Sequence, residues 1–204
     1  MPDPFAQSAL VGVYRPGRFG ALKVGVAPGV TLTERHPFEA VQVAAQKGSE
    51  TRTVDVLTRT LGFAPPAPNR AAGSGAGTLL WVGPERWLAV GPKGHGLYRR
   101  LRGALAEDTA AVVDLSQART CIHVAGPNSR AVLAKGCVLD FHPRARPAGH
   151  VAQSPVASIN AIIHVVETAT AFDLYVARGF AISFWEWLAD ASAEFGYEVT
   201  AKGA

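Results

Sequence analysis

Apolar and polar positions in the first half of the chain predict strands and helices in a definite order. Residues 29–46 hold β-branched and alternating apolar positions, which are typical of one or two strands. Apolar side chains recur on one helical face over residues 50–62. Two apolar runs flank a Gly-Pro-Glu-Arg turn in residues 79–91, which predicts a hairpin. A helix over 96–108 and a short buried strand over 110–115 complete a β-α-β-β-α-β order.

The second half of the chain repeats this order. Its clearest helix covers residues 179–196, where Phe184 and Leu188 share a face and Gly196 ends the pattern. The repeated order predicts an α+β fold of two tandem split β-α-β units, with one continuous mixed sheet as the alternative. The other elements expected here are a strand at 119–126, a short helix at 126–136, strands at 157–167 and 172–177, and a final strand at 197–201.

The pattern also divides the chain into three parts. Residues 1–28 hold Gly, Pro and Arg without a sustained period and are expected to form an extended arm. The first α+β unit is predicted over 29–116 and the second over 117–204. Residues 64–77 are rich in Pro, Gly and Ala, so we expect a flexible surface loop there. Because the glycines of this loop follow a Pro-rich segment and no strand, they do not indicate a dinucleotide site.

Composition narrows the class of protein. The 204 residues are 48% hydrophobic and 18% charged, which is typical of a globular chain. A net charge of +4 without a Lys/Arg block argues against nucleic-acid binding. No stretch approaches the ~18 apolar residues of a membrane span, and the N-terminus lacks the pattern of a secretion signal. We therefore expect a cytoplasmic protein with no membrane contact, in which Cys121 and Cys137 are free thiols.

Motifs for chemistry are sparse. Cys121 and His123 point to the same side of one predicted strand, where packing at a sheet face is favoured over metal binding. Asp114 and Ser116 follow a strand, where a side-chain cap of a turn is favoured over catalysis. A phosphate-binding loop and a nucleophile elbow are both absent from the sequence. The sequence thus predicts no catalytic, cofactor-binding or metal-binding residue in this chain.

A basic loop, defined here as residues 138–153, stands out from the rest. His142, Arg144 and Arg146 alternate with apolar residues, and in an extended, proline-stiffened segment they would project to one side. Such a row of donors suits carboxylates. The sequence favours an interface with a partner protein, with a solvated loop and a small anion pocket as the alternatives.

Two tryptophans add to the same hypothesis. Trp185 and Trp187 lie two positions apart on a predicted helix, about 200° apart around its axis. If one packs in the core, the other is at least partly outside. Tryptophan and arginine are typical anchors of protein–protein interfaces, so the helix is a second candidate contact, with a wide core seam as the alternative.

Four segments of the chain, taken in order, resemble the gamma subunit family of heterotetrameric sarcosine oxidase. The most specific of them contains GPNSRAVLAKGCVLDFHPRAR. The resemblance covers roughly residues 29–196 and includes neither the first part of the arm nor the Pro/Gly-rich loop. The segments are LLWVGPERWLAVGP, VVDLSQART, VAGPNSRAVLAKGCVLDFHPRARPAGHVAQ and FDLYVARGFAISFWEWLADASAEFG.

The resemblance implies a role in a larger enzyme. The family's holoenzyme oxidises sarcosine to glycine, reduces oxygen to hydrogen peroxide and passes the one-carbon unit to tetrahydrofolate. NAD and a folate-binding half belong to the alpha subunit, FAD to the beta subunit, FMN to the boundary between them, and zinc to the delta subunit. The gamma subunit is expected to be a non-catalytic accessory to the alpha, beta and delta subunits, with no cofactor of its own.

The resemblance also implies a fold similar to the folate-binding region of aminomethyltransferases, built from split β-α-β units. This supplies the alternative function, a stand-alone folate-binding protein of one-carbon transfer. Folate-binding relatives hold the pterin ring with an acidic residue in a motif that this chain lacks. Asp114 and Asp140 are the nearest candidates, although neither has the expected surroundings, and Arg144 and Arg146 would suit an anionic glutamyl tail.

Overall fold

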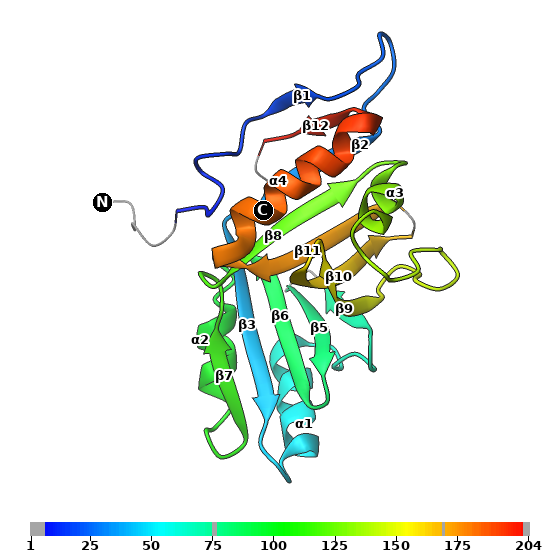
Figure 1. Cartoon of the computed structure of the whole chain (residues 1–204). Helices are drawn as coiled ribbons and strands as arrows, with labels where there is room; N and C mark the ends of the chain where they lie inside the picture. Colours follow the sequence, from blue (N-terminus) through cyan, green and yellow to red (C-terminus); the bar gives the residue numbers. More distant parts are fainter. Residues whose placement is uncertain (1–6, 75–76, 169, 202–204) are drawn as a thin grey trace. The chain divides into compact units, whose positions relative to one another are not determined.

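The computed structural model describes residues 7–74, 77–168 and 170–201, and the chain divides into two compact units (Figure 1). The inserted unit is Pro37–Gln117. The discontinuous unit combines the described residues up to His36 with those from Ala118 to 201. The strands form two separate sheets, so the alternative of one continuous sheet is wrong.

The inserted unit has a five-stranded antiparallel sheet in the order β4-β5-β6-β3-β7. Without β4, this is the strand order of a split β-α-β unit, as the sequence predicts. Its two helices pack over a core of Leu, Val, Ala and Trp side chains. The elements are β3 (Phe38–Ala45), α1 (Glu50–Leu61), β4 (Ala71–Ser74), β5 (Gly77–Gly83), β6 (Arg86–Pro92), α2 (Leu97–Ala104) and β7 (Ala110–Asp114).

Strand β4 corrects the prediction of a loop over residues 64–77. Ala71 pairs with Leu80 and Gly73 with Thr78, so this segment adds an edge strand to the sheet. A Cβ at Gly73 would lie 2.9 Å from the carbonyl oxygen of Gly77, which explains why a residue without a side chain suits this tight pairing. Residues 75 and 76 of that predicted loop lie outside the described residues.

The discontinuous unit has a seven-stranded sheet in the order β1-β12-β2-β8-β11-β10-β9. Strands β12, β8, β11 and β10 again have the split β-α-β order. Strand β2 lies between the first two of these, parallel to β12 and antiparallel to β8. The elements are β1 (Gly17–Phe19), β2 (Val30–Arg35), β8 (Arg119–Ala125), α3 (Ser129–Ala134), β9 (Val151–Val156), β10 (Ile159–Glu167), β11 (Ala171–Ala177), η2 (Arg178–Phe180), α4 (Ala181–Ser192), η3 (Ala193–Phe195) and β12 (Tyr197–Val199).

The position of β2 differs from the predicted division of the chain. The sequence assigns residues 29–36 to the first α+β unit, whereas their strand completes the sheet of the other unit. Alternation of apolar positions predicts that a strand exists, but it does not predict which strands pair with it. Strand β9 is missing from the sequence prediction because its Pro155 argues against a strand; it forms an edge, where proline is tolerated.

The N-terminal arm is more than an extended segment. Leu10 and Tyr14 are buried in the core of the discontinuous unit, and backbone hydrogen bonds from Val13 and Tyr14 to the Leu10 carbonyl close a turn. The Tyr14 ring lies 4.9 Å from the Trp185 ring. Its hydroxyl donates to the Thr200 carbonyl at 2.7 Å and accepts from the Glu34 amide at 3.0 Å. This part of the arm is therefore a core element.

Candidate interface and polar cluster

The basic loop is a turn and not an extended ladder. The backbone amides of Ala145 and Arg146 both donate to the His142 carbonyl at 2.9 Å. The Asp140 carboxylate accepts from the His142 amide at 2.7 Å. The ring of Pro143 fixes its φ at a value that suits this position of the turn. The prediction that residues 142, 144 and 146 project together is therefore wrong, because the prolines favour a turn here as well as an extended chain.

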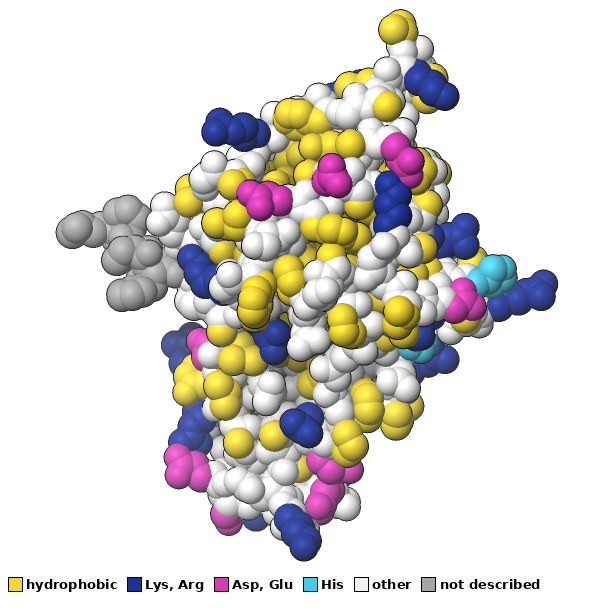
Figure 2. All heavy atoms as spheres, viewed as in Figure 1, with side chains coloured by type: hydrophobic (Ala, Val, Ile, Leu, Met, Phe, Trp, Pro, Cys, Tyr) yellow, Lys and Arg dark blue, Asp and Glu magenta, His cyan; other side chains and the backbone are white. Residues whose placement is uncertain are grey.

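The three basic side chains of the turn differ in exposure. His142 and Arg144 are exposed. Figure 2 shows His and Lys or Arg side chains where the basic loop projects from the surface. Arg146 is half-buried, with its Nη1 atom 3.3 Å from both ring nitrogens of His150. Its guanidinium thus lies against the imidazole ring. His142 and Arg144 are the residues of this set that remain open to a partner.

The two tryptophans of α4 fall on different sides of the helix. Trp185 is 4% exposed and packs in the core, so it cannot act as a surface anchor. Trp187 is half-buried and packs close to Gly136, where an added Cβ would lie 2.4 Å from the indole. Because Gly136 comes two residues before the basic loop, Trp187 borders that loop. The exposed hydrophobic residues at the start of the helix are Phe180 and Ile182.

Asp114 and Ser116 form a cap and not a catalytic pair. The Asp114 carboxylate accepts from the Ser116 amide at 2.9 Å and from its hydroxyl at 2.6 Å. The Ser116 hydroxyl oxygen also accepts from the Ala40 amide at 3.0 Å. The capping interpretation is confirmed. Asp114 and Asp140, the two acids considered for a pterin, are both engaged in hydrogen bonds within their own turns.

A cluster of polar side chains on one face of the seven-stranded sheet was not predicted. Thr33, His123, Asp173 and His164 occupy directly paired positions across β2, β8, β11 and β10. Asp173 Oδ1 accepts from Arg35 Nε at 2.7 Å, and His123 Nδ1 lies 2.7 Å from the same oxygen. Since a carboxylate only accepts, the Nδ1 atom of His123 carries the proton of this bond.

Burial sets the ionisation of this cluster. Burial raises the pKa of the Asp173 carboxyl, but the hydrogen bond from His123 and the charge of Arg35 outweigh it, and the pKa lies below its ordinary value. Burial lowers the pKa of the His164 imidazole. Burial also raises the pKa of the Cys121 thiol well above its usual range. The arrangement holds a carboxylate in place and supplies no activated nucleophile.

The sequence contained a signal for this cluster. Asp173 is the one charged residue in FDLYVA, a segment otherwise suited to a buried strand. A charge in such a position requires a partner. Arg35 and His123 are polar members of two other predicted strands, but the pairing of those strands was not readable from the sequence.

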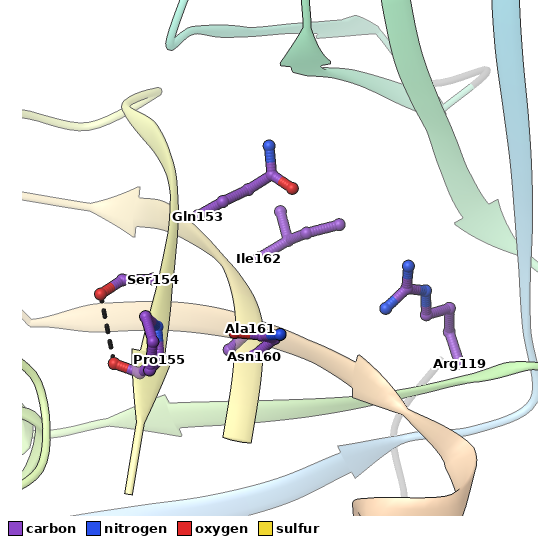
Figure 3. Close-up of a pocket in the computed structure, with 7 residues that line it drawn as sticks. All are labelled: Arg119, Gln153, Ser154, Pro155, Asn160, Ala161 and Ile162. Carbon is purple, nitrogen blue, oxygen red and sulfur yellow. Dashed lines mark hydrogen bonds between the residues drawn. The ribbon is translucent and has the colours of Figure 1, made fainter. Parts of the chain in front are cut away.

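A hollow of about 270 Å³ opens at one end of the same sheet. The side chains of Arg119, Gln153 and Ile162 point toward it (Figure 3). Arg119 pairs across the strands with Ala177. A cation and a carboxamide can hold a polar group there, but the lining includes no general base.

The thiols, a possible metal cluster and a possible membrane span bear on the class of protein. Cys121 and Cys137 are free and buried, as predicted. Within the described ranges, no three His, Cys, Asp or Glu side chains are grouped closely enough to hold a metal ion. Among the same residues, no helix has the length and apolar character needed to cross a bilayer.

Comparison with known proteins places this fold and these residues in a family. The model of the sarcosine oxidase gamma subunit family matches residues 49–194. The sarcosine oxidase subunit gamma of an Arthrobacter species is 32% identical over 145 residues, which is 70% of this chain and 71% of the relative.

Solved structures agree. A chain of the heterotetrameric sarcosine oxidase from Corynebacterium sp. U-96 superposes with a TM-score of 0.75 and 29% identity, over 83% of this chain and 88% of that one. The glycine cleavage aminomethyltransferase T from Bartonella henselae shares the fold, with a TM-score of 0.61 and 16% identity over 85% of this chain and 48% of that one. The match over both units and the shared fold show that the chain belongs to the sarcosine oxidase gamma subunit family.

Proposed function

We propose that the chain is a non-catalytic accessory subunit of a heterotetrameric, flavin-dependent sarcosine oxidase. The observation that carries this proposal is the match to a chain of such an oxidase over most of the length of both chains. The holoenzyme would oxidise sarcosine to glycine, form hydrogen peroxide and pass the one-carbon unit to tetrahydrofolate. The polar cluster around Asp173 supports a structural role, since Asp173 Oδ1 accepts from both Arg35 and His123 and so links three strands of one sheet.

The partners in this proposal are the alpha, beta and delta subunits. FAD, FMN, NAD, tetrahydrofolate and zinc would bind to those partners. This chain would stabilise their association in the cytoplasm. A stable interface of that kind buries at least about 800 Å² on each partner.

Part of that interface would lie at the turn formed by residues 142–146 of the basic loop, called the basic turn from here on. His142 and Arg144 are exposed there, and Trp187 borders the loop through Gly136. Arg146, held against His150, would shape the turn more than it would contact a partner. An exposed arginine and an exposed imidazole beside an aromatic side chain suit an acidic patch on another subunit.

The experiment is to measure assembly of the purified holoenzyme with charge-reversed chains. The His142→Glu/Arg144→Glu variant should bind the other subunits about tenfold more weakly, equal to about 1.4 kcal/mol, with a smaller dependence on salt. Arg52→Glu, an exposed cation on α1, is the matched control and should assemble normally. Unchanged assembly of the double variant would remove the basic turn from the interface. Purification of the unaltered chain without any flavoprotein would overturn the proposed function.

A further inference from the structure

A loop between β1 and β2, residues 20–28, is attached to the discontinuous unit at both of its ends. The Ala21 amide donates to the Ala193 carbonyl at 2.7 Å. The Gly29 amide donates to the Phe195 and Gly196 carbonyls at 3.1 and 2.9 Å. Both ends are therefore held by one short segment that follows α4.

Glycine makes these attachments possible. Gly20 has a φ of +78°, and a Cβ there would lie 2.4 Å from the Ala193 carbonyl oxygen. A Cβ at Gly29 would lie 2.4 Å from Asn128 Oδ1 and 2.8 Å from the Phe195 carbonyl oxygen. Two residues without side chains thus let the backbone approach the 193–196 segment, which fixes the direction in which the loop projects.

Between its fixed ends the loop presents aliphatic side chains to solvent. Val24 is fully exposed, at 105%, and Val26 and Leu22 are 58% and 43% exposed. Figure 1 shows the loop extending beyond β1 and β12, and Figure 2 shows hydrophobic side chains at its tip. A shallow, open hollow of about 550 Å³ lies along the loop, lined by its aliphatic side chains and by Arg18 and Lys23. A compact surface loop is normally packed by its own side chains, which this one is not.

The stretch of sequence that contains the loop carries only positive charge, although Glu198 of the neighbouring strand β12 pairs with one of its cations. No acidic residue occurs between Arg15 and Thr33, whereas Arg15, Arg18 and Lys23 all do. Arg18 pairs with Glu198 at 3.5 Å, and Lys23 is exposed beside the aliphatic tip. A surface complementary to this loop is therefore an apolar groove with acidic residues at its rim.

We propose that residues 20–28 are a hydrophobic plug that inserts into an apolar, acid-rimmed groove of another subunit. This rests on the proposed function, since it requires the oxidase assembly. It is independent of the basic turn, which lies between α3 and β9. Burial of the three aliphatic side chains would favour association, and fixed loop ends would limit the entropy lost on binding.

The first test places the photo-reactive residue p-benzoylphenylalanine at position 24 of the assembled holoenzyme. We expect a cross-link to an apolar segment of a larger subunit, with Asp or Glu within a few residues of the linked position. A cross-link to a second copy of this chain, or no cross-link within an intact assembly, would overturn the plug.

The second test compares Val24→Asp with Val11→Asp, because both valines are exposed in the discontinuous unit. The first variant should weaken association at least tenfold, while the second should not change it. Thermal unfolding of both free chains should match the unaltered chain, since neither side chain is in the core. Lys23→Glu should weaken association and reverse its salt dependence.

The outcomes separate the plug from the proposed function. If the unaltered chain assembles and Val24→Asp assembles equally well, the plug is wrong and the accessory role stands. If the unaltered chain joins no flavoprotein, the accessory role is overturned and the plug falls with it.

Discussion

His123 and Asp173 face each other at paired positions of β8 and β11, with Nδ1 and Oδ1 2.7 Å apart. Asp173 is 6% exposed, and its carboxylate also accepts from Arg35 of β2 at 2.7 Å. The polar contact therefore joins three neighbouring strands of one sheet, including the strand that comes from the N-terminal part of the chain. It fixes which residue of β2 lies opposite β8, because a slip of one residue would turn Arg35 to the other face.

Replacing Asp173 by Asn should lower the free energy of unfolding by about 3 kcal/mol. The change leaves the Arg35 charge beside His123 without the carboxylate that both face, and the loss of one member of a buried ion pair is costly. Urea unfolding monitored by tryptophan fluorescence measures the effect. Asp55→Asn, an exposed acid on α1, serves as the control. A loss below 1 kcal/mol would mean that the pair contributes little.

Acid should destabilise the protein through His164. Burial lowers the pKa of this imidazole below its ordinary 6.5, so the unfolded chain takes up the proton first as pH falls. The stabilising contribution is complete above pH 6.5 and is lost as pH falls below that value. The unaltered chain should therefore lose more stability between pH 7.5 and 5.5 than His164→Gln does. Parallel pH profiles of the urea midpoint would contradict this account.

Neither cysteine should react with a thiol reagent while the chain is folded. Burial raises the pKa of the Cys121 thiol, and both thiols are shielded from solvent. Labelling with a disulfide reagent at pH 8 should remain near zero in buffer and reach two thiols per chain in urea. Rapid labelling of one thiol in buffer would show that one of these sites opens.

The glycine at the start of the plug loop should resist substitution. Gly20→Ala would place a Cβ against the Ala193 carbonyl at a positive φ, at a cost of more than about 1 kcal/mol. Gly12→Ala is the control, because an added Cβ there meets no atom within 4 Å. Thermal unfolding of both variants makes the comparison. Equal midpoints would show that the backbone at Ala193 can move to accommodate the added Cβ at little cost in stability.

Local patterns in the sequence were enough to predict most elements and the duplicated order. Gly62, after α1, has the left-handed conformation typical of the residue that ends a helix. The strand neighbours of β2 were not predictable, because period-two alternation says which face is buried and not which strand lies alongside. The turn in the basic loop differs from the expected extended segment for another reason: proline permits both backbone conformations, and a hydrogen bond from the His142 amide to Asp140 favours the turn.

Because local patterns do not reveal strand pairing, the sequence predicted only part of the candidate site. His142, Arg144 and Arg146 were visible because they are close in sequence, whereas Arg35, His123 and Asp173 are brought together by strand pairing alone. Residues 22, 24 and 26 are ordinary aliphatics in the sequence. Their exposure follows from the attachment of the loop ends to the segment after α4, which no local pattern encodes.

The place of β2 between β8 and β12 has a consequence for synthesis on the ribosome. Every strand of the inserted unit lies between residues 37 and 117, so that unit can complete its sheet as soon as this stretch has emerged. Strand β2 is made before it, yet both of its partners are made after it, the last at Tyr197–Val199. The nascent chain must keep the apolar strand β2 unpaired while the inserted unit folds, and β1 gains its partner only when β12 is made, which makes this part of the chain a natural target for a chaperone.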